Sequence, residues 1–163
     1  MTVFHQLPPF RIFYIGGDVM NQIRHGCQEH SQDRGPEPLV MNIACAARSN
    51  TNFRTTLWTG SNLQLTVMCI PVGGDIGAEI HEDIDQFIRI ESGCALVKMG
   101  CSPNTLTMQQ HVYSSDALII PAGTWHNVIN LGNTPLKLYS VYAPPKHPYG
   151  TIHRTKMDAA ERN

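Results

Sequence analysis

Short apolar or alternating runs fill the chain from residue 52 onward, and turn-forming residues separate them. The runs cover residues 53–59, 63–70, 86–91, 94–99, 106–113, 117–120, 126–130 and 136–143. The segments between them are rich in glycine, proline, asparagine and serine, and they show no helical period. The pattern therefore predicts roughly eight or nine short strands, which is typical of an all-β sandwich or barrel.

The flanks of this block predict a three-part organisation. Residues 1–50 form an N-terminal arm or extension, partly irregular, in which 39–47 is apolar enough to dock on the main body as a strand or a helix. Residues 51–145 form the predicted β-barrel. Pro144 and Pro145 end its last strand because neither can donate a backbone hydrogen bond. Residues 146–163 are expected to be a C-terminal tail with little to bury.

Composition and charge exclude several classes of protein. Of the 163 residues, 42% are hydrophobic and 15% are charged, which excludes an intrinsically disordered chain. A formal net charge of -1 creates no field that would collect nucleic acid or an anionic membrane. No apolar run reaches the roughly 20 residues of a membrane span, and the N-terminus is interrupted before an export signal could form. We expect a cytoplasmic protein with no nucleic-acid and no membrane partner.

The cysteines do not form a metal or disulfide motif. Five of them are scattered along the chain: Cys27, Cys45, Cys69, Cys94 and Cys101. Their number is odd and no C-x-x-C pair is present, which argues against a disulfide scaffold and against a thiolate zinc site. Reduced thiols are therefore expected.

Strand alternation predicts that four polar side chains converge inside the barrel. Glu79 and His81 are two residues apart, so in an extended segment they point the same way and could bind one cation. Gln86 shares a strand face with the apolar Ile88, and it points inward if Ile88 belongs to the core. His126 begins a third inward-facing set after a proline- and glycine-containing turn.

A divalent cation is the favoured explanation for these polar groups in a barrel interior. A buried Glu79 without a positive partner would cost several kcal/mol or become neutral. Two histidines and one carboxylate with open positions suit iron(II), manganese, nickel or zinc, and a glutamine oxygen can be a weaker fourth ligand. The alternative interpretation is a hydrogen-bonded polar core without a metal.

The spacing of these residues resembles the two sequence motifs of the cupin superfamily. The first motif is matched by Gly73, Glu79-Ile80-His81, Gln86 and Gly93 at the family's intervals. The second is matched by Ser115, Pro121-Ala122-Gly123, His126 and Asn130, with serine in place of the opening glycine. The resemblance covers about residues 52–145. It implies a double-stranded β-helix, or jelly roll, with one metal ion between the two motifs.

Carried over by position, the resemblance implies four metal ligands: Glu79, His81, Gln86 and His126. Glu79 stands where the family has its first histidine, and Gln86 stands where the family has its glutamate. The set therefore keeps one carboxylate but moves it across the site. Asp85 is an alternative to Gln86 if a bend shifts the strand register.

The region 136–156 is also similar to small single-domain cupins that are labelled mannose-6-phosphate isomerase-like. This resemblance implies a metal that holds adjacent sugar oxygens and a base that moves a proton between neighbouring carbons. The candidate catalytic bases are His111, Tyr113 and Tyr142. The candidate phosphate anchors are Lys98, Arg89 and Lys137, the last two on the outward strand parity.

Two other functions fit the same ligand set. A dioxygenase would use iron(II) at Glu79, His81 and His126 and would need neither a phosphate anchor nor a separate base. A non-catalytic binder of a sugar or another metabolite would use the cation only to organise its pocket. The expected partner is a small molecule, such as a sugar or a sugar phosphate.

Apolar residues on outward strand positions predict self-association. Phe87, Tyr139 and Val141 lie on the parity opposite to the core, so one external sheet face carries more apolar area than a solvated sheet requires. A symmetric homodimer would bury this face.

Overall fold

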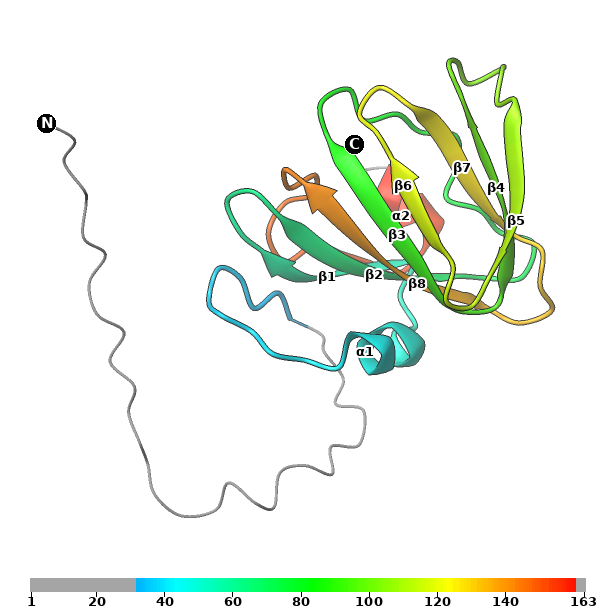
Figure 1. Ribbon diagram of the computed structural model, residues 1–163. Helices are drawn as coiled ribbons and strands as arrows, with labels where there is room; N and C mark the ends of the chain where they lie inside the picture. Colours follow the sequence, from blue (N-terminus) through cyan, green and yellow to red (C-terminus); the bar gives the residue numbers. More distant parts are fainter. Residues whose placement is uncertain (1–31, 161–163) are drawn as a thin grey trace, which may run out of the picture.

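The computed structural model of the chain describes residues 32–160, which form two antiparallel sheets and two short helices (Figure 1). The strands are β1 (Arg54–Thr59), β2 (Gln64–Ile70), β3 (Asp85–Ser92), β4 (Cys94–Gly100), β5 (Met108–Tyr113), β6 (Ala117–Ile120), β7 (Trp125–Asn130), β8 (Leu136–Ala143) and β9 (Ile152–His153). The helices are α1 (Ile43–Ser49) and α2 (Lys156–Ala160), and neither is long and apolar enough to cross a membrane. The predicted all-β fold is confirmed. Residues 1–31 of the predicted arm lie outside the described residues.

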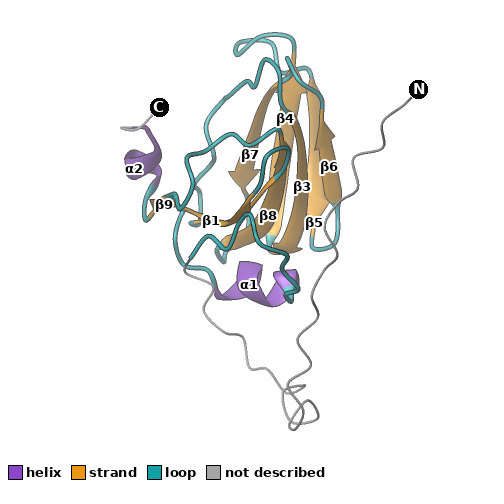
Figure 2. Ribbon diagram, turned by 90° about the vertical axis from the view of Figure 1, so that its left-hand side faces the viewer, coloured by secondary structure: helices purple, strands orange, loops and turns teal. Residues whose placement is uncertain are grey.

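The two sheets face each other as two layers (Figures 1 and 2). The larger sheet has the strand order β6-β3-β8-β2-β1-β9, and the smaller has the order β5-β4-β7. Apolar side chains from both layers form one core, which includes Met68, Ile88, Leu138, Val97 and Val128. The burial of these side chains between the layers is the main source of stability for the fold.

Strand alternation divides the inner face of the larger sheet into an apolar part and a polar part. On β8 every second residue is buried, from Leu136 to Tyr142. Across the ladder Leu138 pairs with Ile90, whereas Tyr142 pairs with Gln86 on one side. On its other side Tyr142 pairs with Gln64, which is also fully buried. Polar groups therefore gather at one end of the barrel interior.

Helix α1 covers part of the outer face of the larger sheet. Its N-terminus is capped by Asn42, whose side chain accepts a hydrogen bond from the backbone N–H of Cys45 at 3.0 Å. Ala46 and Ala47 pack against Leu57 and Val67 because their small side chains allow the helix to approach the sheet closely. The segment expected to dock as a strand or a helix thus does so as a helix.

Helix α1 also reduces the apolar surface on which the predicted homodimer depends. Tyr139 joins the cluster beneath α1, so part of the outward apolar face is covered by the chain itself. Phe87 and Val141 stay half-buried, and Ile119 on the neighbouring strand β6 is 68% exposed. The homodimer stays a prediction that rests on this smaller area.

The C-terminal segment is part of the barrel, so the expectation that it has little to bury is wrong. β9 pairs with β1 through Arg54 and His153, and Ala159 of α2 joins the core. Gln64 ties the segment to β2, since its amide donates to the carbonyl oxygen of His147 and its Oε1 accepts from the backbone N–H of the same residue, both at 2.8 Å. A strand of two residues is too short to produce a periodic signal in the sequence.

The expectation of reduced thiols is correct for only some of the described cysteines. Cys69, Cys94 and Cys101 are free, whereas Cys45 in α1 is disulfide-bonded. Of the three free thiols, Cys69 and Cys94 are half-buried and Cys101 is exposed. None of them belongs to the group of residues that could hold a metal ion in the described chain.

Asn130, the last residue of the second motif, ties the end of β2 and the loop between β7 and β8 together at the end of β7. Its side-chain amide donates to the carbonyl oxygens of Ile70, Pro71 and Thr134 at 3.0, 3.1 and 2.9 Å. Its Oδ1 accepts from the backbone N–H of Gly132 at 2.8 Å, and the residue is 1% exposed. The motif asparagine is thus a structural residue whose buried polar atoms are all satisfied.

We expect Asn130→Ala to lower the free energy of unfolding by about 2–3 kcal/mol, because it leaves buried carbonyl groups without their donor. Urea denaturation followed by circular dichroism measures the change. The exposed Asn104 provides a control, and Asn104→Ala should change stability by no more than about 0.5 kcal/mol. Equal effects of the two substitutions would contradict the structural role of Asn130.

Candidate metal centre

Two backbone hydrogen bonds bring the first motif against the second. The N–H of Glu79 donates to the carbonyl oxygen of His126 at 3.0 Å, and the N–H of His126 donates back at 2.9 Å. The N–H of Gly123, which has a φ of +75°, donates to the carbonyl oxygen of His81 at 2.7 Å. These bonds fix the loop 71–84 against β7 and bring side chains that are distant in sequence to one place.

The side chains of Glu79, His81 and His126 converge at this junction. Glu79 Oε1 lies 3.5 Å from His81 Nε2 and 3.4 Å from His126 Nε2. The ligand atoms of the three residues all lie within 4.8 Å of one another. Metal–ligand bonds of about 2.1 Å place neighbouring ligands roughly 3–3.5 Å apart. The predicted clustering of these three residues is therefore present, and its dimensions fit one ion.

The orientation of His126 makes its free nitrogen an acceptor. Its Nδ1 lies 2.9 Å from the carbonyl oxygen of Thr124, which can only accept, so Nδ1 carries the hydrogen. In the neutral ring Nε2 is then the nitrogen without a hydrogen, which is the form of histidine that binds a metal ion. A backbone carbonyl in this position orients metal-binding histidines and sets their tautomer.

Burial and charge act in opposite directions on Glu79. Burial by itself would raise the pKa of this carboxyl, but the two imidazoles of His126 and His81 and the positive field of Arg54 hold the pKa well below its usual range. The carboxylate is therefore ionised at neutral pH. Since His126 is fully buried and His81 is 6% exposed, this charge faces an interior with little access for water.

Gln86 points into the same interior, as the strand parity predicts. It is 3% exposed, its Nε2 donates to Ser140 Oγ at 2.9 Å, and its Oε1 is buried without a hydrogen-bond partner among residues 32–160. The alternative residue, Asp85, is exposed and accepts from the backbone N–H of Ala122 at 3.0 Å. Gln86 is thus the better placed of the two, and its role as a fourth ligand stays a prediction.

Of the three candidate bases, the structure brings only Tyr142 to the cluster. His111 and Tyr113 are exposed on β5. Tyr142 is fully buried, and its ring lies 5.7 Å from that of His81 in an edge-on arrangement. Burial raises the pKa of Tyr142, so its hydroxyl keeps its proton at neutral pH.

The three candidate phosphate anchors lie away from the cluster. Arg89 forms an ion pair with Glu91. Lys137 donates to the carbonyl oxygen of Asn50, at the end of α1 on the outer face. Lys98 lies on the side of β4 opposite to its buried residues. None of the three contributes a positive charge to the interior.

Two residues of the interior escaped the sequence analysis. Arg54 is 5% exposed on β1, and His147 lies beyond the last long strand with its ring 5.1 Å from that of Tyr142. Burial, followed by the positive field of Arg54, lowers the pKa of His147 to about 3. The first four residues of β1 are all buried, so no alternating pattern marks Arg54 as inward-facing.

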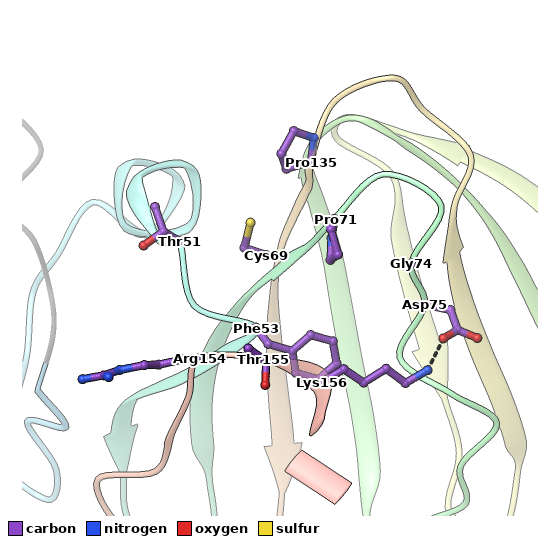
Figure 3. Close-up of a pocket in the computed structure, with 10 residues that line it drawn as sticks. All are labelled: Thr51, Phe53, Cys69, Pro71, Gly74, Asp75, Pro135, Arg154, Thr155 and Lys156. Atoms are coloured by element: carbon purple, nitrogen blue, oxygen red, sulfur yellow. Dashed lines mark hydrogen bonds and ion pairs between the residues drawn. The ribbon is translucent and has the colours of Figure 1, made fainter. Parts of the chain in front are cut away.

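A separate cavity of about 510 Å³ lies outside this cluster (Figure 3). Phe53, Pro71 and Pro135 line it, together with residues 154–156. Lys156 at its edge forms an ion pair with Asp75, so that charge is already neutralised. None of the four predicted metal ligands lines this cavity, which separates it from the candidate metal centre.

The sequence and the fold are similar to those of known proteins. The profile of the family described as Cupin domain matches residues 66–142. The chain is 59% identical over 128 residues to the uncharacterized protein YrkC of Bacillus subtilis (strain 168), a match that covers 78% of this chain and 69% of that protein.

Solved structures extend this similarity to the fold. The crystal structure of BH2720 from Bacillus halodurans is similar at 55% identity with a TM-score of 0.79, and the match covers 80% of this chain and 98% of that one. A conserved protein with a double-stranded β-helix domain from Klebsiella pneumoniae shares the fold at 21% identity and a TM-score of 0.56, over 73% of this chain and 100% of that one. These likenesses agree with the double-stranded β-helix that the motif spacing implies.

The buried His147 predicts a loss of stability in acid. Its pKa rises from about 3 in the folded chain to 6.5 when unfolded, so the unfolded chain binds more protons between these values. The stability that the neutral ring contributes is complete above pH 6.5 and falls as the pH drops toward 3, by at most about 1.4 kcal/mol per pH unit. Urea denaturation at pH 7, 6, 5 and 4 should therefore show a flatter pH dependence for His147→Gln than for the wild type.

The exposed His111 supplies the control for this comparison. His111→Gln should leave the slope of stability against pH unchanged. A His147→Gln slope that equals the wild-type slope would mean that His147 is not a neutral buried group.

Proposed function

Because the chain belongs to the cupin family, we propose that it is a mononuclear non-haem metalloenzyme in which Glu79, His81 and His126 hold one divalent ion. The favoured ion is iron(II), and the favoured reaction is the oxidation of a small molecule by dioxygen. Two histidines and one carboxylate leave coordination positions open, and this arrangement is typical of iron(II) oxygenases. The bound ion would supply the site at which substrate and dioxygen meet.

The observation that carries this proposal is the meeting of three potential ligand atoms. Glu79 Oε1 faces the Nε2 atoms of both His81 and His126, at 3.5 and 3.4 Å, and all three atoms are buried without a hydrogen-bond partner in the described part of the chain. Without an ion, a neutral His81 could donate to this oxygen from Nε2, but His126, whose Nδ1 carries the hydrogen, could do so only as an imidazolium. One divalent ion satisfies all three atoms at once.

The surrounding residues support an oxygenase more than a sugar-phosphate isomerase. An isomerase requires a base close to the substrate and an anchor for the phosphate group. His111 and Tyr113 are exposed on β5, and Tyr142 keeps its proton, so it is suited to donate a hydrogen bond. The anchors that the sequence suggests face outward. An oxygenase needs none of these groups.

The chain itself supplies orientation and exclusion of water. Thr124 holds the ring of His126 through its carbonyl oxygen, and Tyr142 packs against the ring of His81. Both imidazoles are buried, whereas the side chain of Glu79 is 27% exposed. The carboxylate side is therefore the more open side of the cluster in the part of the chain that the structure describes.

We expect about one equivalent of metal per wild-type chain, and at least tenfold weaker metal binding after His81→Ala or His126→Ala, because each removes one of three ligands. Metal analysis by mass spectrometry and calorimetric titration of the metal-free protein measure both values. His111→Ala is the matched control, since this exposed histidine lies outside the cluster. Full metal content in both ligand variants would overturn the proposed site.

The same preparation tests the oxygenase assignment without a known substrate. Iron(II) with open positions binds nitric oxide, and the complex is visible by electron paramagnetic resonance. We expect this signal in the iron-loaded wild type and not in His126→Ala. A protein that purifies with zinc and gives no such signal after iron loading would favour a non-redox enzyme or a binding protein.

A second substitution series tests Gln86 as the fourth ligand. Gln86→Ala should weaken iron binding by about tenfold, less than the loss of a histidine, because a neutral amide oxygen is a weak ligand. Gln86→Glu should strengthen binding, since it adds a negative charge. Asp85→Asn is the control, and it should have no effect. If Asp85→Asn weakens binding and Gln86→Ala does not, the fourth ligand is misassigned.

A further inference from the structure

Arg54 places a positive charge inside the barrel. It lies on β1 opposite Met68 of β2 and opposite His153 of β9, and Met68 belongs to the core. Arginine is almost never buried unless it is paired, because removing its charge from water costs several kcal/mol. Arg54 is one of these rare buried arginines, since it is only 5% exposed.

The contacts of Arg54 do not neutralise this charge. Its Nη2 lies 3.9 Å from the sulfur of Met68, and its Cζ lies 5.7 Å from the centre of the Phe53 ring. Its Nε is buried without an acceptor, and the guanidinium forms no ion pair with a carboxylate anywhere in residues 32–160. An arginine cannot lose its proton to escape this situation.

Other polar atoms on the same face also lack partners. Thr66 Oγ1 and the hydroxyl of Tyr142 are buried, and neither makes a hydrogen bond of regular geometry in the described chain, although Ser140 and Arg54 lie near the Tyr142 hydroxyl. Thr66 pairs with Ser140 on β8, two positions before Tyr142, so these groups line one continuous stretch of the inner face. Buried hydroxyl groups without partners are rare in proteins, so these two groups are available to an ordered water or a bound polar molecule.

The balance of charge indicates the sign of that molecule. With a divalent ion bound at the cluster, the Glu79 carboxylate and the Arg54 guanidinium leave two surplus positive charges in a largely enclosed interior. His147 stays neutral at physiological pH and does not change this balance. A ligand with one or two negative charges would remove the surplus.

The shape of the donors favours a carboxylate over a phosphate. A guanidinium offers two parallel N–H groups that match the two oxygens of a carboxylate. Phosphate sites usually add free backbone N–H groups or a helix N-terminus. Along β1 and β2 the backbone groups are already engaged in the sheet ladder, so the inner face offers one cation and hydroxyl groups.

We propose that the barrel interior binds a small organic acid whose carboxylate pairs with Arg54 and whose second oxygen donor reaches the metal ion held by Glu79, His81 and His126. Thr66 and Tyr142 would donate hydrogen bonds to the same molecule. The charge balance and the metal-facing end of this assignment rest on the proposed function, whereas the buried guanidinium of Arg54, without an ion pair in the described chain, does not. The substrate class is thus an organic acid and not a neutral sugar.

Calorimetric titration of the full chain with malonate, succinate and glutarate tests this proposal, with 1,4-butanediol and inorganic phosphate as the uncharged and the phosphate probes. At least one diacid should bind to the metal-loaded wild type, and Arg54→Met should weaken it by about tenfold or more. Arg54→Lys should give an intermediate loss because it keeps the charge but not the paired N–H groups. Phosphate binding in the absence of diacid binding would overturn the carboxylate assignment.

Two controls separate a binding role from a structural role and from binding elsewhere. Replacing an unpaired buried charge by an apolar side chain of similar length should leave the thermal stability of the ligand-free protein unchanged or higher, so Arg54→Met should not lower its melting temperature. Arg154→Met removes a cation that lines the outer cavity of Figure 3 and should leave diacid binding intact. Loss of binding in Arg154→Met but not in Arg54→Met would move the acid to that cavity and overturn the proposal.

The same titration in metal-free protein distinguishes this proposal from the proposed function. Weaker diacid binding that still depends on Arg54 would support the acid subsite even if the metal assignment failed. Metal binding at the cluster without any diacid binding would leave the proposed function standing and overturn the acid subsite.

Discussion

The paired backbone hydrogen bonds between Glu79 and His126 are the constraint on which the candidate site depends. They join the loop that holds Glu79, which has no regular strand structure, to the beginning of strand β7 at His126. The side chains of both residues extend from this junction. A side-chain cluster can hold an ion only if its ligands stay within a few tenths of an ångström of their positions. Backbone bonds to a strand give this precision, whereas side-chain contacts alone would not.

The second constraint is the division of the barrel interior. Around Leu138 and Ile90 the inner face is apolar and supplies the stability of the fold. Around Tyr142 the same strands present polar groups, several of which lack hydrogen-bond partners among residues 32–160, and such groups destabilise the folded chain. The apolar end therefore offsets the cost of the polar end. Fold and site use the same strands but different rows of side chains.

Strand alternation and motif spacing predicted most of the fold and most of the cluster. The alternating pattern of β8 and the turns beside it are local properties, so the sequence carries them directly. Glu79, His81 and His126 were accessible because their spacing resembles a known motif. Arg54 could not be predicted as an interior residue, because the first four residues of β1 are all buried and its neighbours show no alternation. The positions of His147 and β9 could not be predicted either, because they depend on pairing with a distant strand, which no local pattern encodes.

The C-terminal segment has a consequence for access to the barrel interior. Residues 146–160 supply the strand that covers the edge of β1 and the imidazole that packs on Tyr142. They therefore form a wall of the polar end of the barrel, on the side of Arg54 and Tyr142. A change in this segment would alter the polar end while leaving the apolar rows around Leu138 and Ile90 in place.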